Sequence, residues 1–226
     1  MDPEGRLFDS WPQRYDRWFE TPAGKLIKRY ESRVMLDLLR PGAGELIFDG
    51  GCGTGIFTRD VLACQARVVG LDVSLPMLVR AAEKCGCSHF WPVAGDLLAL
   101  PFATGLFDRV VSMTALEFIE NGREAVNELF RVTKKGGTVV VATLNSLSPW
   151  AEKRRAKAEQ GDPFFQRMIF RSPDELNNLA PLDGELRTAI HFSKEEDPAL
   201  IPDIEEDGRQ RGLLTGAFLA VRWVNP

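Results

Sequence analysis

Short apolar runs alternate with helix-forming segments between residues 45 and 145, and this alternation constrains the fold more than any other feature of the chain. Runs such as ELIFDG, RVVGLDVS and GTVVVATLN have the length and composition of buried strands. Strands that alternate with helices are joined by parallel crossovers. The sequence therefore predicts an α/β fold: a doubly wound, Rossmann-like, seven-stranded sheet with an antiparallel last strand and helices on both faces.

The element boundaries follow from periodicity and capping residues. We expect strands at 45–50, 67–74, 89–96, 107–114, 137–145, 185–193 and 215–224, and helices at 21–42, 55–66, 75–86, 122–137 and 172–180. Thr21, Ser74 and Ser172 are expected helix caps. The repeat of Leu26, Tyr30, Val34 and Leu38 predicts the apolar face of the first long helix, and a shorter helix precedes it. The last two strands should pair antiparallel at the sheet edge, joined by an acidic stretch.

We interpret residues 1–226 as a single domain with two additions to its core. Residues 1–40 form an N-terminal helical cap, and residues 146–171 form a lid insertion. Residues 148–171 hold six Lys or Arg against three acids, together with Trp150 and three phenylalanines. This composition favours an acceptor that is apolar with an anionic group, or alternatively a solvated amphipathic helix that covers the sheet.

Composition excludes several classes of function. The formal net charge is -4, so no nucleic-acid partner is expected. No apolar run is long enough for stable membrane insertion, and the charged, aromatic N-terminus lacks the apolar core of a secretion signal, which predicts a cytoplasmic protein. Cys85 and Cys87 form a C-x-C, but no second ligand pair accompanies them, so we expect no metal site. We expect a monomer or a homodimer.

The stretch FDGGCGTGIF, residues 48–57, places a glycine-rich loop between the first strand and its helix. Doubly wound sheets bind nucleotide-like ligands at that position. Dinucleotide sites use G-x-G-x-x-G, but here the third position falls on Ile56. Asp49 precedes the glycines, and a carboxylate repels a pyrophosphate but attracts an ammonium. The loop thus favours a cationic ligand, with a nicotinamide oxidoreductase as the weaker alternative.

The chain resembles the class I S-adenosylmethionine-dependent methyltransferases, in the methyltransferase type 11 group related to ubiquinone/menaquinone-biosynthesis methyltransferases. The resemblance is carried by FDGGCGTG, GLDVSLPML, AGDLLALPF and FDRVVSMTALEFI, in family-like order and spacing, and covers most of residues 44–145. It implies a methyltransferase that uses S-adenosyl-L-methionine, releases S-adenosyl-L-homocysteine and acts on a small-molecule acceptor. A non-catalytic S-adenosylmethionine-binding sensor or assembly protein is the alternative.

The same resemblance implies roles for single residues. Asp49 and the glycines would hold the amino-acid end of the cofactor, Asp72 the ribose, and Asp96 with the Leu97 backbone the adenine. Met77 would lie against adenine or be a core methionine, and Asp96 could be a plain turn acid. The expected cofactor-binding residues are Asp49, Gly50, Gly51, Gly53, Gly55, Asp72, Val73, Met77, Asp96, Leu97, Met113 and Thr114.

The catalytic residue stays open, because the sulfonium is already activated and a base is needed only where a proton must leave. Tyr15 resembles an N-terminal tyrosine that contacts the cofactor in some relatives, and could equally be a packing anchor. Glu117 could orient an acceptor or take a proton, or it could be a solvated acid. His191 is a further candidate, with a structural role as its alternative.

Overall fold

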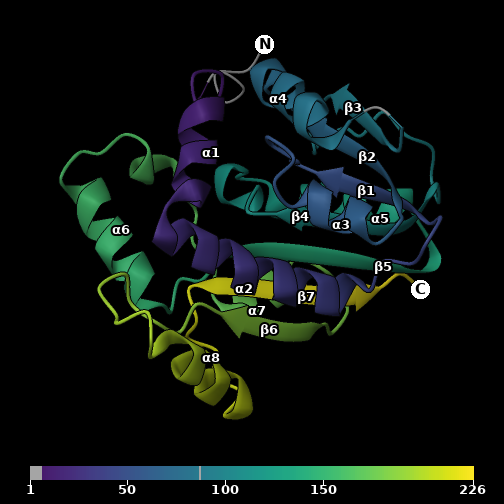
Figure 1. The fold of residues 1–226 in the computed structure, drawn as a ribbon. Helices are drawn as coiled ribbons and strands as arrows, with labels where there is room; N and C mark the ends of the chain where they lie inside the picture. Colours follow the sequence, from purple (N-terminus) through teal and green to yellow (C-terminus); the bar gives the residue numbers. More distant parts are fainter. Residues whose placement is uncertain (1–6, 87) are drawn as a thin grey trace.

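A seven-stranded sheet forms the centre of the computed structural model, which describes residues 7–86 and 88–226 (Figure 1). Its strand order is β3-β2-β1-β4-β5-β7-β6. The strands are β1 (Leu46–Gly50), β2 (Arg67–Asp72), β3 (Phe90–Ala94), β4 (Phe107–Met113), β5 (Thr133–Leu144), β6 (Glu185–Ala189) and β7 (Phe218–Val224). Strands β1 to β5 are parallel, and β7 is antiparallel to β5 and β6. The predicted doubly wound sheet with an antiparallel last strand is confirmed.

Helices cover both faces of this sheet. They are α1 (Pro12–Glu20), α2 (Pro22–Leu39), α3 (Thr58–Ala63), α4 (Leu75–Cys85), α5 (Gly122–Val132), α6 (Pro149–Glu159), α7 (Pro173–Asn177) and α8 (Ile201–Gln210), with short 3-10 turns η1 (Leu116–Phe118) and η2 (Phe165–Arg167). Helices α2, α3 and α4 share one apolar core, and α5 and α7 share the other. Strand β5 serves both, because Val140 faces the first core and Val139 and Val141 face the second.

The predicted helix starts are confirmed by their caps. The Thr21 hydroxyl accepts a hydrogen bond from the Gly24 N–H at 3.0 Å, and Ser74 caps α4 in the same way. Ser172 forms a capping box with Glu175, in which each side chain accepts from the other residue's backbone N–H. Each cap satisfies a backbone donor that the first helical turn leaves free.

Several elements differ from the sequence prediction. The helices expected over 55–66 and 172–180 are shorter, Thr58–Ala63 and Pro173–Asn177, and the strand expected over 185–193 ends at Ala189. The helix expected over 122–137 ends at Val132, and residues 133–137 already belong to β5. The Thr133 backbone is extended, its hydroxyl donates to the Leu129 carbonyl, and Lys134 pairs with Asp108 of β4. The contact with α5 and the ion pair with β4 keep this segment extended. Gly136 and Gly137 therefore lie within β5 and do not end a helix. The acidic stretch between the last two strands contains α8, which periodicity did not indicate.

Over most of its length the buried stripe of α2 lies one residue further along than predicted. Ile27, Glu31 and Met35 are buried in this stripe, whereas Leu26, Tyr30 and Val34 are only partly buried. Leu38, the last residue of the predicted face, is fully buried as expected. Helix α2 packs against β5, β6 and β7, so the second half of the predicted N-terminal cap covers the sheet. This shift of the stripe places an acid, Glu31, among the buried residues.

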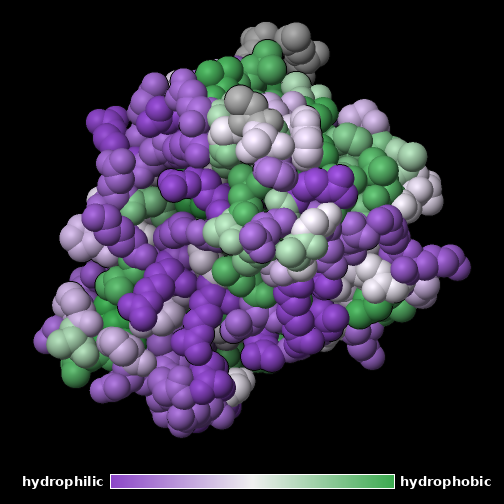
Figure 2. All heavy atoms as spheres, turned by 45° about the vertical axis from the view of Figure 1, so that its right-hand side comes forward, coloured by the Kyte–Doolittle hydropathy of each residue, from purple (hydrophilic) through white to green (hydrophobic). Residues whose placement is uncertain are grey.

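The surface is largely hydrophilic, with hydrophobic residues more frequent toward the end where α4 and β3 lie (Figures 1 and 2). Exposed apolar side chains there include Val73, Leu75, Val79 and Trp91. Within 7–86 and 88–226, no helix has the length and apolar character needed to cross a membrane. Residues 1–6 of the predicted cap, and Cys87 of the C-x-C, lie outside the described residues.

Candidate active site

The glycine loop follows β1 at the carboxyl edge of the sheet. The N–H groups of Gly51 and Cys52 both donate to the Leu71 carbonyl of β2, at 2.7 and 3.0 Å. Gly51, Gly53 and Gly55 all have positive φ, between 53° and 76°. A Cβ on Gly51 would lie 2.4 Å from the Ala115 Cβ, but one on Gly53 would have no neighbour within 4 Å. Ala115 therefore fills the space beside Gly51, whereas the space beside Gly53 is open. That space leaves room for a ligand against the backbone.

Two carboxylates flank this loop, Asp49 buried and Asp72 partly buried. Asp49 is 2% exposed, and its Oδ2 accepts a 2.6 Å hydrogen bond from the Thr58 hydroxyl. Burial raises the pKa of Asp49 to about 6; the Thr58 hydrogen bond opposes this rise and the nearby Asp72 adds to it. Asp72 accepts from the N–H groups of Gly53 and Ser74, both at 2.9 Å. No Lys or Arg within the described parts of the chain pairs with either acid, so together they present uncompensated negative charge.

The other predicted cofactor residues gather at the same edge. Met77 and Leu97 are buried, and Val73 is half exposed. A Cβ on Gly50 would lie 2.6 Å from the Leu97 side chain, so the loop after β3 reaches the end of β1. Asp96 is exposed, and its Oδ1 accepts from the Leu98 N–H at 2.9 Å, as a turn acid does.

Strand β4 contributes Met113 and Thr114 to this edge. Met113 is buried, and Thr114 has a φ of 48°, which is unusual for a β-branched residue. The Thr114 N–H donates to the Ala142 carbonyl of β5 and holds the strained backbone in place. Strained residues concentrate at functional sites, where the surrounding structure maintains them.

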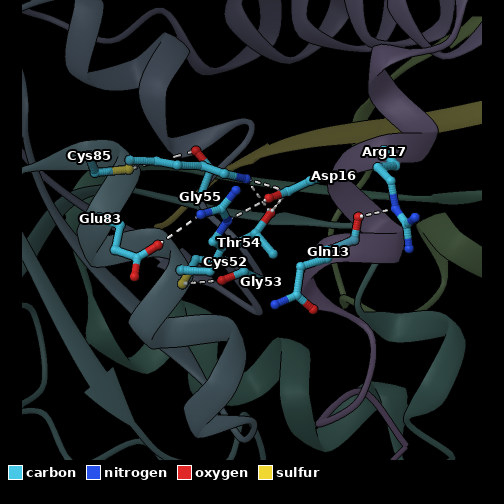
Figure 3. Close-up of polar contacts among 11 residues, drawn as sticks. Gln13, Asp16, Arg17, Cys52, Gly53, Thr54, Gly55, Glu83 and Cys85 are labelled. Carbon is cyan, nitrogen blue, oxygen red and sulfur yellow. Dashed lines mark hydrogen bonds and ion pairs between the residues drawn. The ribbon is translucent and has the colours of Figure 1, made fainter.

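Helix α1 is fastened over the glycine loop by Asp16 (Figure 3). Asp16 accepts from the Thr54 hydroxyl at 2.7 Å, from Arg80 Nε at 2.9 Å and from the Lys84 ammonium. Burial acts to raise the pKa of Asp16, but the hydrogen bonds from Lys84, Thr54 and Arg80 outweigh it and lower that pKa. These contacts join α1, the loop and α4 in one buried network.

Aromatic rings join the N-terminal segment to the predicted lid. Trp11 stacks on Phe164 at 4.5 Å between centroids, and Phe8 contacts Phe118 at 4.8 Å and Phe164 at 6.3 Å. Phe118 belongs to η1, directly after β4. Phe164, one of the lid aromatic residues noted in the sequence, therefore connects the start of η2 with the segment before α1 and with η1.

Two of the three catalytic candidates lie near this edge. Burial raises the pKa of Tyr15, and Glu31, Glu117 and Asp72 add to the rise, which places its hydroxyl among those acids. Glu117 in η1 is fully buried, so the alternative that it is a solvent-exposed acid is wrong. Its Oε1 accepts from the Leu144 N–H at 2.8 Å, and burial raises its pKa to about 7.

The third candidate, His191, lies elsewhere. It follows β6, and β4, β5 and β7 stand between that strand and β1. The His191 ring packs against Gly208 of α8, where an added Cβ would lie 2.5 Å from it. The His191 backbone N–H donates to the carboxylate of Glu205, also in α8. Burial lowers the pKa of this imidazole.

Sequence reasoning missed two charged residues near Glu117, a buried acid and a partly buried arginine. Glu31 of α2 is 6% exposed, and burial raises its pKa to about 8. Arg154 of α6 acts electrostatically on both Glu31 and Glu117. Glu31 stands four residues from Ile27 and from Met35, and an acid within an apolar helix stripe was the available signal. Arg154 carried no signal that distinguished it from the other basic residues of the lid.

No group of three or more possible metal ligands exists within the described residues. The Cys85 thiol of the C-x-C instead lies 3.7 Å from the Gly55 carbonyl. The residues present do fit S-adenosylmethionine: the carboxylates of Asp49 and Asp72 lack a positive partner, and the loop is open at Gly53. An ammonium and a sulfonium would supply the missing positive charge.

Comparisons with known proteins agree with this reading. The methyltransferase domain family matches residues 48–141. The demethylmenaquinone methyltransferase of Thermobifida fusca is 34% identical over 74% of this chain and 73% of its own length. The malonyl-[acyl-carrier protein] O-methyltransferase of Erwinia pyrifoliae is 41% identical over 52% of this chain and 44% of its own.

The chain spans about half the length of the malonyl-[acyl-carrier protein] relatives that it matches most strongly, between 44% and 52%. An S-adenosylmethionine-dependent methyltransferase structure from Thermotoga maritima superimposes with a TM-score of 0.75, covering 98% of this chain and 99% of that one. At 20% identity this likeness shows the fold. The match to the Thermobifida enzyme, over most of both chains, carries the assignment: the chain belongs to the S-adenosylmethionine-dependent methyltransferase family.

Proposed function

We propose that this chain transfers a methyl group from S-adenosylmethionine to a small-molecule acceptor that is apolar with an anionic group. The observation that carries the proposal is the open glycine loop between two carboxylates without a positive partner, the buried Asp49 and the partly buried Asp72. Relatives are named for malonyl-[acyl-carrier protein] and demethylmenaquinone. Family membership disfavours the nicotinamide alternative. The cytoplasmic location and the oligomeric state stay predictions.

The bound cofactor supplies a methyl group already activated by the sulfonium. The protein's part is to position both reactants and to exclude water. We assign the amino-acid end to Asp49 and the glycines, the ribose to Asp72, and the adenine to Asp96, Leu97 and Met77. Helix α1 and the lid, residues 146–171, cover the site through the Asp16 network and the aromatic contacts.

Replacing Asp72 tests the cofactor assignment. Asp72→Ala should weaken S-adenosylmethionine binding by roughly 1–3 kcal/mol, because ribose hydroxyls lose a charged acceptor. Titration calorimetry measures this, and Asp203→Ala, an exposed acid of α8, is the matched control. Unchanged affinity in folded Asp72→Ala would remove Asp72 from the site.

Turnover separates the enzyme from the non-catalytic alternative. Purified protein with S-adenosylmethionine and a panel of small acceptors should form S-adenosylhomocysteine, detected by mass spectrometry. Binding of the cofactor without product on any acceptor would favour the sensor or assembly protein.

A further inference from the structure

Three buried polar atoms in η1, β5 and α6 lack an ordinary hydrogen-bond partner among the described residues: Glu117 Oε2, Thr143 Oγ1 and Arg154 Nη1. Glu117 interacts electrostatically with Arg154 and more weakly with the Thr143 hydroxyl, so the three lie near one another. Ser112 Oγ and Arg222 Nε also lack a partner, elsewhere in the sheet. The Thr143 hydroxyl lowers the pKa of Glu117 as a weak hydrogen-bond donor, and the Arg154 guanidinium lowers the pKa of Glu31 by its charge. Buried polar atoms are rarely left unpaired in native proteins, so Glu117 Oε2 and Arg154 Nη1 are the atoms here with capacity to bind a ligand or an ordered water.

The elements that carry these atoms are firmly held. The other Glu117 oxygen accepts from the Leu144 N–H at 2.8 Å, and the Glu117 carbonyl accepts from the Ile169 N–H at 2.8 Å. Arg154 lies over the Trp150 ring at 5.5 Å, and the Trp150 indole donates to the Phe192 carbonyl at 2.7 Å. The unpartnered atoms are therefore features of a fixed arrangement.

Arg154 lies over an aromatic ring as Arg155 and Lys157 do, but among the described basic residues of the lid it alone has a buried nitrogen without a hydrogen-bond partner. Lys153 pairs with Glu195, Arg171 donates to the Leu116 and Ile119 carbonyls, and Lys157 lies over the Phe165 ring. Arg155 lies over Phe170. Arg154 thus has the buried, unsatisfied donor that an anionic atom of a ligand would meet.

The chemistry of the three atoms selects among acceptors. Glu117 needs a donor, Arg154 needs an acceptor oxygen, and an ionisable hydroxyl provides both in turn. An ammonium offers Arg154 nothing and is repelled by it, and a carboxylate offers Glu117 no proton. Glu31 and Tyr15 border the group from α2 and α1, since both interact electrostatically with Glu117.

We propose that Glu117 and Arg154 form the acceptor subsite and receive a weakly acidic hydroxyl, a phenol or an enol. This inference rests on the proposed function. Glu117 takes the hydroxyl proton and Arg154 stabilises the resulting oxyanion. The acceptor oxygen forms a bond to the methyl carbon while the carbon–sulfur bond breaks. The electron pair of the broken bond stays on the sulfur of S-adenosylhomocysteine. A carboxyl whose pKa lies near 7 suits this proton transfer at neutral pH.

The test uses the full chain saturated with S-adenosylhomocysteine and three probes on one ring: para-nitrophenol, para-nitrobenzoate and para-nitrobenzylamine. We expect para-nitrophenol to bind best and its bound form to absorb as the phenolate at a lower pH than the free compound. Glu117→Gln and Arg154→Met should each weaken its binding by at least about tenfold. Arg154→Met should also remove the shift in absorbance.

Lys153→Met, on the exposed face of the same helix, is the control and should change neither quantity. S-adenosylhomocysteine affinity should stay unchanged in all variants. If Glu117→Gln does not fold, Arg154→Met decides alone. The inference is overturned if para-nitrophenol fails to bind, if the benzoate or the amine binds more tightly, or if the variants bind the phenol as the wild type does. Failure of the wild type to bind S-adenosylhomocysteine would instead contradict the proposed function.

Discussion

Gly53 differs from the other glycines of its loop in what surrounds it. Gly51 and Gly55 could not carry a side chain, because Ala115 and Cys85 already occupy the space. Gly53 has open space beside it and needs glycine only for its φ of 53°. Its N–H is also bound to Asp72, so this residue connects the loop to the proposed ribose acid. A methyl group added here would intrude on a ligand without disturbing the core.

Gly53→Ala should therefore reduce S-adenosylmethionine affinity by more than about tenfold. It should cost only about 1–2 kcal/mol of unfolding free energy, the usual penalty of a left-handed alanine. Gly212→Ala is the matched control, because Gly212 has a φ of 61° and no neighbour within 4 Å of an added Cβ. Calorimetry and urea unfolding measure both effects. Equal cofactor affinity in the two variants would show that no ligand approaches Gly53.

The position of a residue could be predicted from the sequence where a local pattern determines it. Asp49 and Asp72 end apolar strands, so their position at the carboxyl edge followed from the strand pattern. Glu31 was missed because the apolar face of α2 was placed one residue too early. The burial of Glu117 depends on η1, β5 and the lid coming together, which are distant in sequence. No local pattern carries that information.

Helix α1 shows how a short element is positioned by charge as well as by apolar packing. It has nine residues, and its buried acid Asp16 binds side chains from the glycine loop and α4. At the element scale the sequence predicted this helix without a cap, and predicted α2 and α4 by their caps Thr21 and Ser74. It did not predict α8 or the early start of β5, because tertiary contacts define both.

Asp16→Asn should loosen α1 and speed the release of S-adenosylhomocysteine several-fold. Lys84 and Arg80 would lose their shared carboxylate, at a cost of about 1–3 kcal/mol in unfolding free energy. Stopped-flow displacement measures the release rate, and Glu20→Gln, an exposed acid at the end of α1, is the control. A release rate equal to that of the control would separate α1 from cofactor retention.

The whole molecule buries acids at a single edge of its sheet. Burial raises the pKa of Glu31 to about 8, of Glu117 to about 7 and of Asp49 to about 6. The facing charged groups are Arg154 of α6 and Arg171, with Tyr15 of α1 nearby. Two arginines do not restore the ordinary pKa values, so the free protein folds with this edge poorly compensated. The cationic cofactor proposed to bind beside Asp49 would offset the negative charge of that acid, which couples ligand binding to stability.

The sign of the pH dependence follows from these values. An unfolded chain releases the Glu31 proton near its ordinary pKa of 4.5, whereas the folded chain keeps it to about 8. Between those values the folded state binds more protons, so the unfolding free energy of the free protein falls as pH rises from about 5 to about 8.

Glu31→Gln removes this term. The variant should match the wild type near pH 5 and exceed it by about 1–3 kcal/mol near pH 8, less than the full pKa shift implies, because Glu31 and Glu117 share the burial cost. Urea unfolding at a series of pH values measures the difference, with Glu152→Gln, an exposed acid of α6, as the control. Parallel stability curves for Glu31→Gln and the wild type would mean that Glu31 is not held protonated in the folded protein, so that this buried acid carries its negative charge at neutral pH.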